Sequence, residues 1–328
     1  MSAAVEDALA RIAAHNGVAA PAVVNRQPFS YRTSFPLEAV EIRHQDGSRE
    51  SLIVKQIDWR RLDEQARLAK PWWLFDPVRE PLVYERVLPD GEPGPPRLHG
   101  WISAEEAGSL LFVERIHGPV LWQSGDAGVW EEVARWLARN QLRVDVAARS
   151  GLPLVDCDEA HLVEWLERGR EGVAHSQWPR RRRRALERLF SAYEDAIALL
   201  LTLPRSFLHN ELFASNVLLR KSSDGARVAA IDWELAGVGP ALVDVAALSV
   251  GRWGRGRSPC LDEAYRETLP AGHRLTLDDL SYANGMRACR LFLSVRALVP
   301  ELRGWRPPRE HRHDWLQEGL EAADSLRV

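Results

Sequence analysis

The sequence predicts an α+β protein in which a strand-rich N-terminal part precedes a mainly helical C-terminal part. Apolar and polar residues alternate in several short runs before residue 117, and this is the period of half-buried strands. After His117-Gly118-Pro119 the apolar spacing changes to that of amphipathic helices. At 328 residues the chain is also long enough for two units. We therefore expect two lobes, residues 1–117 and 118–328.

Strand and turn signals dominate the first part. Four alternating runs predict strands at 37–43, 51–57, 97–102 and 109–114. Asp46-Gly47 lies between the first two runs and is a strong hairpin signal. Residues 1–17 have the spacing of an amphipathic helix, and so do residues 77–88, which precede a breaker stretch rich in Pro and Gly at 89–96.

The second part is expected to be helical with one interruption. Apolar spacing predicts helices at 130–144, 158–168 and 183–201. Between these and further C-terminal helices lie a strand ending at Leu208, a polar loop, and a hairpin of 217–219 and 228–231. Asn216 starts one hairpin strand and Asp232 follows the other. We therefore expect both side chains, with Glu211 of the polar loop, at one edge of this hairpin.

Composition and charge exclude several classes of protein. A 45% apolar content excludes a disordered chain, and a net charge of −3 argues against nucleic acid as a partner. The three cysteines form no CxxC pair, which excludes a disulfide framework and favours a reducing compartment. No apolar run approaches the ~20 residues of a membrane span. We expect a soluble, cytoplasmic protein with no membrane partner.

Several conspicuous segments have ordinary structural interpretations. The thirteen tryptophans are expected mainly in the core and at lobe edges. Arg180–Arg184 could bind phosphate, but a solvated helix face is favoured. Asp156-Cys157-Asp158 is faintly similar to a DxD phosphatase site, yet it lacks a βαβ context and is expected to cap a helix. The patterns GxxxxGK[ST], HExxH and GxSxG do not occur in the sequence, which disfavours P-loop, zincin and α/β-hydrolase enzymes.

The polar loop and hairpin carry the chemistry. Asn216 and Asp232 offer hard oxygen ligands, too few for an all-protein cage, and this is typical of Mg²⁺ that arrives with a nucleotide. Glu211 in the same loop can accept a proton from a hydroxyl group or orient that group for in-line attack.

The order of these residues resembles that of aminoglycoside phosphotransferases and choline-kinase-like enzymes. The pattern His209-x-Glu211-x4-Asn216, with Asp232 after a short hairpin, resembles their catalytic loop and metal-binding aspartate. The resemblance covers residues 28–250. It implies a protein-kinase-like two-lobe fold, with a small antiparallel-sheet N-terminal lobe that binds nucleotide and a mainly helical C-terminal lobe that holds the catalytic loop and the acceptor site.

Further segments extend the resemblance. Lys55 matches the strand lysine that holds the α/β-phosphates, and Glu80 matches the helix glutamate that pairs with it. Glu114 to Ile116 match the hinge whose backbone meets adenine, and Gly239-Pro240 and Asp244 match the segment after the catalytic loop. The resemblance thus implies ATP or GTP and Mg²⁺ as cofactors, and a hydroxylated small molecule as acceptor.

The sequence departs from the family pattern at two places. Glu211 stands where the family usually has Asp, and the extra methylene moves the carboxylate by roughly 1.5 Å, a displacement of the size that can cost ~10²-fold in rate. The front loop, residues 27–34, contains no glycine. Thr33 and Ser34, or the guanidinium of Arg32, would have to cover the phosphates.

Two smaller questions remain open in the sequence. His209 either shapes the loop by hydrogen bonding, which we favour, or transfers a proton itself. The basic segment Gly251–Arg257 argues against a polycationic aminoglycoside as substrate. It fits a neutral or anionic acceptor as well as a mobile surface loop.

Three hypotheses follow. The first is an ATP- and Mg²⁺-dependent phosphotransferase acting on a hydroxyl of an antibiotic, sugar or related metabolite. The second is a catalytically degenerate, pseudokinase-like protein that binds nucleotide or ligand, and Glu211 is its main argument. The third, an unrelated α+β protein with accidental matches, predicts that Lys55 and Asp232 lie far apart.

Overall fold

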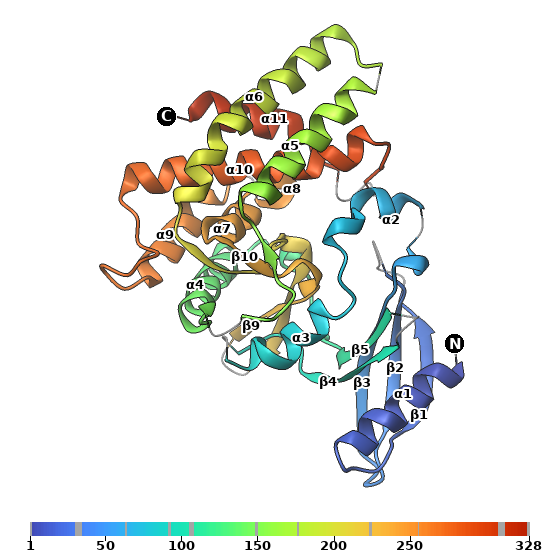
Figure 1. Ribbon diagram of the computed structural model, residues 1–328. Helices are drawn as coiled ribbons and strands as arrows, with labels where there is room; N and C mark the ends of the chain where they lie inside the picture. Colours follow the sequence, from blue (N-terminus) through green and yellow to red (C-terminus); the bar gives the residue numbers. More distant parts are fainter. Residues whose placement is uncertain are drawn as a thin grey trace.

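The computed structural model describes most of the chain as one sheet-containing part and one helical part (Figure 1). The described residues are 2–29, 35–62, 64–90, 93–104, 108–147, 150–175, 177–222, 225–254, 256–307 and 312–326. Within these ranges, no helix combines the length and the apolar character needed to cross a membrane.

A five-stranded antiparallel sheet forms the first part. Its order is β1-β2-β3-β5-β4, with β1 Ala22–Pro28, β2 Leu37–Arg43, β3 Arg49–Ile57, β4 Leu98–Ala104 and β5 Gly108–Glu114. The predicted hairpin around Asp46-Gly47 is confirmed, since β2 and β3 pair from Arg43–Arg49 to Leu37–Lys55. Strand β1 was missed, because five of its seven residues are exposed and its apolar residues do not alternate.

The sheet separates two hydrophobic cores. Helix α1 (Ser2–His15) packs on one face, where Leu9 and Ile12 join Leu52 and Val54 of β3 in the smaller core. Successive side chains of a strand point to opposite faces. Ile57 of β3 therefore faces the other way and belongs to the main core, and Lys55 shares that face.

Helix α3 (Arg79–Arg86) lies on the main-core side of the sheet. It is shorter than the predicted helix at 77–88. The turn before it is held by Asp76, whose side chain accepts hydrogen bonds from the backbone N–H groups of Val78 and Arg79. Beyond Val87 the chain tightens into a 3₁₀ turn, Leu88–Asp90, where Pro89 cannot donate an intrahelical hydrogen bond. The short helix α2 (Glu64–Ala69), which the sequence did not predict, precedes α3.

The second part is helical, as predicted. Its helices are α4 Ala127–Arg143, α5 Glu159–Ala174, α6 Arg180–Thr202, α7 Leu242–Ser249, α8 Gly251–Gly254, α9 Ser258–Thr268, α10 Asp279–Leu302 and α11 Trp315–Ser325. Asp158 caps α5 by accepting a hydrogen bond from the backbone N–H of His161, and Arg180–Arg184 are exposed. The helix-cap interpretation of Asp156-Cys157-Asp158 and the exposed-face interpretation of Arg180–Arg184 are therefore confirmed.

Short strands interrupt the helices where the sequence predicted them. Strand β7 (Arg205–Leu208) precedes the polar loop, and β8 (Val217–Ser222) pairs with β9 (Gly225–Ala230) as an antiparallel hairpin. Two further strands were missed: β6 (Val155–Asp156) and β10 (Gly237–Pro240), which form a small sheet with β7. Strands of two and four residues are too short to show a period in the sequence.

Candidate active site

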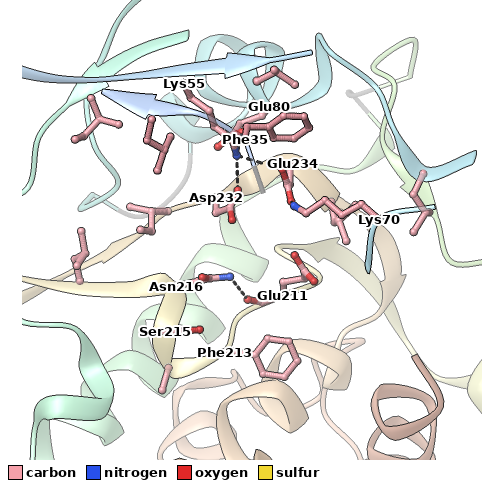
Figure 2. A pocket seen from close by; sticks show the side chains of 18 of the residues that line it. Phe35, Lys55, Lys70, Glu80, Glu211, Phe213, Ser215, Asn216, Asp232 and Glu234 are labelled. Atoms are coloured by element: carbon pink, nitrogen blue, oxygen red, sulfur yellow. Dashed lines mark hydrogen bonds and ion pairs between the residues drawn. The ribbon is translucent and has the colours of Figure 1, made fainter. Parts of the chain in front are cut away.

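A cavity of about 430 Å³ lies between the main-core face of the five-stranded sheet and the polar loop after β7 (Figure 2). Ile53, Lys55 and Val113 line it from the sheet, and Glu80 lines it from α3. Glu211, Phe213 to Asn216, Asp232 and residues of α10 line the opposite side. The cavity therefore brings together residues from both parts of the chain.

Lys55 lies at the centre of a charge cluster. Its Nζ donates to Glu80 Oε2 at 2.6 Å and to Glu234 Oε2 at 3.2 Å, and it also contacts Asp232 Oδ1. Because Lys55 and Asp232 are 177 residues apart in sequence and yet in contact, the hypothesis of accidental matches is wrong. Ligand oxygens of the three carboxylates lie within 4.8 Å of one another, a separation suited to a metal ion, but here the Lys55 ammonium contacts all three.

A second ion pair, which the sequence analysis missed, completes the cluster. Lys70, directly after α2, contacts Glu234, and its Nζ lies 5.6 Å from the centre of the Phe35 ring (Figure 2). Glu234 follows Asp232 by two residues and could have been found by its place in the motif. Lys70 lies in a segment without any motif, so nothing in the sequence marked it.

Burial and ion pairing oppose each other in this cluster. Burial alone would lower the pKa of Lys55, but Asp232 and Glu80 outweigh burial and raise it above its usual value. Burial likewise would raise the pKa of Asp232, but Lys55 and Lys70 hold it below the usual range. Burial lowers the pKa of Lys70. Lys55 and Asp232 are thus held as a charged pair.

The polar loop is held by buried groups from α7 and α10. Asp244 of α7 accepts hydrogen bonds from the backbone N–H groups of His209 (2.7 Å) and Asn210 (2.8 Å). Asn210 has a left-handed backbone (φ 69°), which is costly for a residue with a side chain. Arg296 of α10 donates to the side-chain and backbone oxygens of Asn210, at 2.8 and 2.5 Å, and so holds it in this conformation.

His209 is buried and hydrogen-bonded on both ring nitrogens. Its Nε2 lies 2.8 Å from the backbone oxygen of Ile231, and a carbonyl can only accept, so Nε2 carries the proton. Nδ1 then accepts from the backbone N–H of Glu211 at 3.3 Å. Burial lowers the pKa of His209 to about 4, so the ring is neutral at pH 7. These contacts support the loop-shaping role that the sequence analysis favoured.

Glu211 and Asn216 face the cavity from the same loop (Figure 2). The Asn216 side chain donates from Nδ2 to the backbone oxygen of Glu211 at 3.0 Å, which leaves its amide oxygen available as a ligand. The Glu211 side chain keeps 27% of its surface exposed, and its Oε1 lies 3.8 Å from Arg296 Nη2. The loop thus presents one carboxylate and one amide oxygen to a reactant.

Asp232 sits at the end of β9 with a left-handed backbone (φ 67°). The backbone N–H of Ile231 donates to the backbone oxygen of Asn216 at 2.9 Å, so the predicted convergence of Asn216 and Asp232 at one edge is confirmed. The Asp232 side chain remains 28% exposed although one oxygen contacts Lys55. A carboxylate and an amide oxygen at one edge are hard ligands, and this donor set fits Mg²⁺.

Glu114 to Ile116, the hinge residues expected to contact adenine, line the cavity. The Glu114 side chain is paired with Arg220 of β8, whose Nη2 donates to it at 2.9 Å, and Ile116 borders the cavity. Gly118, two residues after Ile116, lies directly against β8: a Cβ atom there would lie 2.0 Å from the Leu219 backbone oxygen. The segment from Glu114 to Gly118 is therefore fixed to the β8–β9 hairpin, which Asp232 follows.

Some expected site residues fall outside the described ranges. Thr33, Ser34 and Arg32, which were expected to cover the phosphates, are among them. The first four residues of the basic segment Gly251–Arg257 form α8, Gly251–Gly254. The side chains of Arg252 and Trp253, and residue 255, also lie outside the described part.

Comparison with known proteins agrees with this geometry. The model of the phosphotransferase enzyme family matches residues 83–277, which is more than half of the chain. A comparison with curated protein sequences gives no match.

Solved structures with the same fold are distant in sequence. The macrolide 2′-phosphotransferase MphH from Brachybacterium faecium is 16% identical, with 99% of each chain covered and a TM-score of 0.54. LicA in complex with AMP is 15% identical, with 98% of each chain covered and a TM-score of 0.58. Spectinomycin phosphotransferase APH(9)-Ia, solved with ADP and spectinomycin, is 12% identical, with 92% of this chain and 93% of that chain covered and a TM-score of 0.57. The expected protein-kinase-like two-lobe fold is thereby confirmed.

Proposed function

The chain belongs to the phosphotransferase enzyme family, and we propose that it transfers the γ-phosphoryl group of ATP or GTP, bound with Mg²⁺, to a hydroxyl group of a small molecule. One observation carries the proposal: Lys55 joins Glu80 and Asp232 inside a cavity that also holds Glu211 and Asn216. An ion pair of this kind presents an ammonium group to phosphates beside a metal-binding carboxylate.

We assign the nucleotide to the sheet side of the cavity. Lys55 would contact the α/β-phosphates, with Glu80 holding its ammonium in place, and Glu114 to Ile116 would border the base. In this proposal residues 1–117 form the nucleotide lobe and residues 118–328 form the lobe that holds the catalytic loop and the acceptor. Phosphate contacts from Thr33 and Ser34 stay a prediction.

Asn216 and Asp232 would hold Mg²⁺. Mg²⁺, when bound, neutralises the charge of the phosphates and lowers the barrier for transfer. Glu211 would orient the acceptor hydroxyl and take its proton, while the acceptor oxygen forms a bond to the γ-phosphorus and the bond from that phosphorus to the departing diphosphate breaks. His209 would keep the loop in shape, since its ring is neutral and committed on both nitrogens.

A second function remains open because of one residue. Glu211 replaces the usual aspartate, and its carboxylate lies 3.8 Å from the guanidinium of Arg296. A chain with these features could bind nucleotide without transfer. We favour transfer because the Lys55–Glu80 pair and both oxygen ligands are present together.

Thermal unfolding tests the nucleotide site directly. The full chain is melted alone, with Mg-ATP, with Mg-GTP, and with ATP plus EDTA, beside the variant Asp232→Asn. A nucleotide at ~100 times its dissociation constant stabilises by about 2.7 kcal/mol, which gives a measurable rise in melting temperature. We expect a Mg²⁺-dependent rise in the wild type that is lost in Asp232→Asn.

The outcomes separate the two functions. A Mg²⁺-dependent rise together with ADP release in the presence of a hydroxylated acceptor supports phosphotransfer. A rise without ADP release across an acceptor panel favours the pseudokinase-like alternative. If neither nucleotide changes the melting temperature, the proposal fails. Lys55→Met serves as a second variant, because it should weaken nucleotide binding without removing a metal ligand.

A further inference from the structure

The end of the cavity beyond Glu211 has an apolar wall. Phe213 contributes from the polar loop, Leu293 and Ala297 from α10, and Trp315 from α11. Val250 and Trp305 extend the same wall. Because Phe213 lies two residues after Glu211, the wall and the carboxylate that faces the acceptor belong to one rigid loop.

The aromatic part of this wall is preformed. The Phe213 and Trp315 rings meet edge to face, with centroids 6.0 Å apart at an interplanar angle of 66°. The His313 ring packs on Trp315, with ring centroids 4.9 Å apart at an interplanar angle of 81°. His313 Nε2 lies 3.0 Å from Glu318 Oε2 of α11. Packing of this kind holds ring faces in place before a ligand arrives, so apolar ligand surface can bind without a cost for ordering them.

The described carboxylates around the cavity are already committed to other groups. Asp76 accepts hydrogen bonds from the backbone N–H groups of Val78 and Arg79, and Glu114 pairs with Arg220. Glu80 and Asp232 hold Lys55, and Glu234 is shared by Lys55 and Lys70. Glu211, the carboxylate nearest the apolar wall, faces Arg296 at 3.8 Å.

This charge balance excludes one class of acceptor. A ligand with several ammonium groups must leave water, and each buried ammonium group needs a carboxylate partner. Among the described residues of the cavity, the acceptor end offers Glu211 alone, and the transfer step needs that carboxylate for the hydroxyl group.

We propose that the acceptor is a hydroxylated molecule with a broad apolar face and at most one positive charge, which packs on Phe213 and Trp315 and turns its hydroxyl toward Glu211. This inference rests on the proposed function, and it names the substrate class of that same site.

Binding to the Mg-ADP complex of the full chain tests the inference without turnover. Isothermal titration calorimetry compares three hydroxylated probes: erythromycin, a mostly apolar macrolactone with one amine; kanamycin, a polycation; and choline, a small cation with little apolar surface. We expect erythromycin to bind at least about 10-fold tighter than the other two, a ratio that corresponds to about 1.4 kcal/mol.

Variants connect this ranking to the wall. Trp315→Ala should weaken erythromycin at least about 10-fold and Trp315→Phe about 3-fold or less, because the phenyl ring keeps part of the apolar face. Trp178→Ala is the matched control: Trp178 lies beside Arg182, outside the cavity lining, and its loss should leave erythromycin binding unchanged. ADP affinity should be the same in all variants.

Three results would overturn the inference: tighter binding of kanamycin or choline, no binding of erythromycin, or a Trp315→Ala variant that binds erythromycin like the wild type. The ranking is measured on the wild type, so it stands even if Trp315→Ala does not fold. Loss of Mg-ADP binding in the wild type would instead refute the proposed function. The two failures are therefore distinguishable.

Discussion

Arg296 of α10 donates to both the side-chain oxygen and the backbone oxygen of Asn210, the residue directly before Glu211. A long C-terminal helix thus determines the backbone shape of the loop that carries the predicted base. Asp244 of α7 completes the arrangement by accepting the Asn210 backbone N–H. Arg296 and Asp244 are both buried, so neither contact competes with water.

The left-handed backbone of Asn210 gives the first prediction. Asn210→Gly and Asn210→Ala both lose the side-chain contact with Arg296, but glycine adopts φ 69° without the steric cost that alanine incurs. Asn210→Ala should therefore be less stable than Asn210→Gly by about 1 kcal/mol. Urea unfolding of the two variants measures this difference, and equal stabilities would contradict the left-handed conformation.

The second prediction concerns the length of the Glu211 side chain. The loop is fixed by His209, Asp244 and Arg296, so it cannot move forward to compensate for a shorter residue. Glu211→Asp should therefore lower kcat by ~10²-fold while leaving the KM for nucleotide nearly unchanged. Steady-state kinetics distinguishes the cases: a higher kcat in Glu211→Asp would show that glutamate hinders transfer.

The pair of Lys70 and Glu234 gives a third prediction. Lys70→Met removes one of the two ammonium groups that contact Glu234, and Lys55 stays in contact with it. The variant should therefore destabilise by less than the roughly 3–5 kcal/mol of a fully uncompensated buried charge, and adding Glu234→Gln should restore part of the loss. A double-mutant cycle on the free energy of unfolding measures the coupling. Additive single effects would show that the two side chains do not interact.

Two buried histidines predict the response to acid. Burial lowers the pKa of His161 and of His209 to about 4, from 6.5 in the unfolded chain. Between these values the unfolded state binds protons that the folded histidines do not, so the contribution of the two histidines to stability falls as pH falls below about 6.5. Asp244 acts in the opposite sense, because burial raises its pKa to about 7. Each histidine contributes a slope of about 1.4 kcal/mol per pH unit.

His161→Gln isolates one of these contributions. His161 accepts a hydrogen bond from Trp165 Nε1 at 3.2 Å, and a glutamine oxygen can replace that acceptor. The variant should lose about half of the histidine-dependent slope between pH about 6.5 and about 5, as measured by urea unfolding at several pH values. An unchanged slope would show that His161 protonates in the folded protein.

Much of this site could be read from the sequence because its residues lie in or beside predicted hairpins. Lys55 lies within the second strand of the first hairpin, and Glu211, Asn216 and Asp232 flank a second hairpin. Local periodicity places such residues at sheet edges before any tertiary contact is known. The Lys55–Glu80 contact was anticipated as well, through the family resemblance.

The residues that were missed act over long sequence distances. Arg296 reaches Asn210 across 86 residues, and no period or motif marks that arginine among the apolar residues of α10. Lys70 is paired with Glu234 through the fold alone. Strand β10 has only four residues, two of them glycines, and it forms because β6 and β7 supply partners on both sides. The Arg296–Asn210 contact, the Lys70–Glu234 contact and strand β10 all depend on tertiary packing, which a local sequence pattern does not reveal.

Helix α1 packs on the back of the sheet whose other face lines the cavity proposed to bind nucleotide. The side chain of Ile12 fills the space above Gly100 of β4, where a Cβ atom would lie 2.5 Å from it. The cavity residues of β3 and β5 are thus backed by a second layer that faces away from the ligand. In the proposed function, the rigidity of the strands that face the nucleotide would therefore depend on a helix on the opposite face of the sheet, and destabilising α1 would weaken nucleotide binding without changing any residue of the cavity.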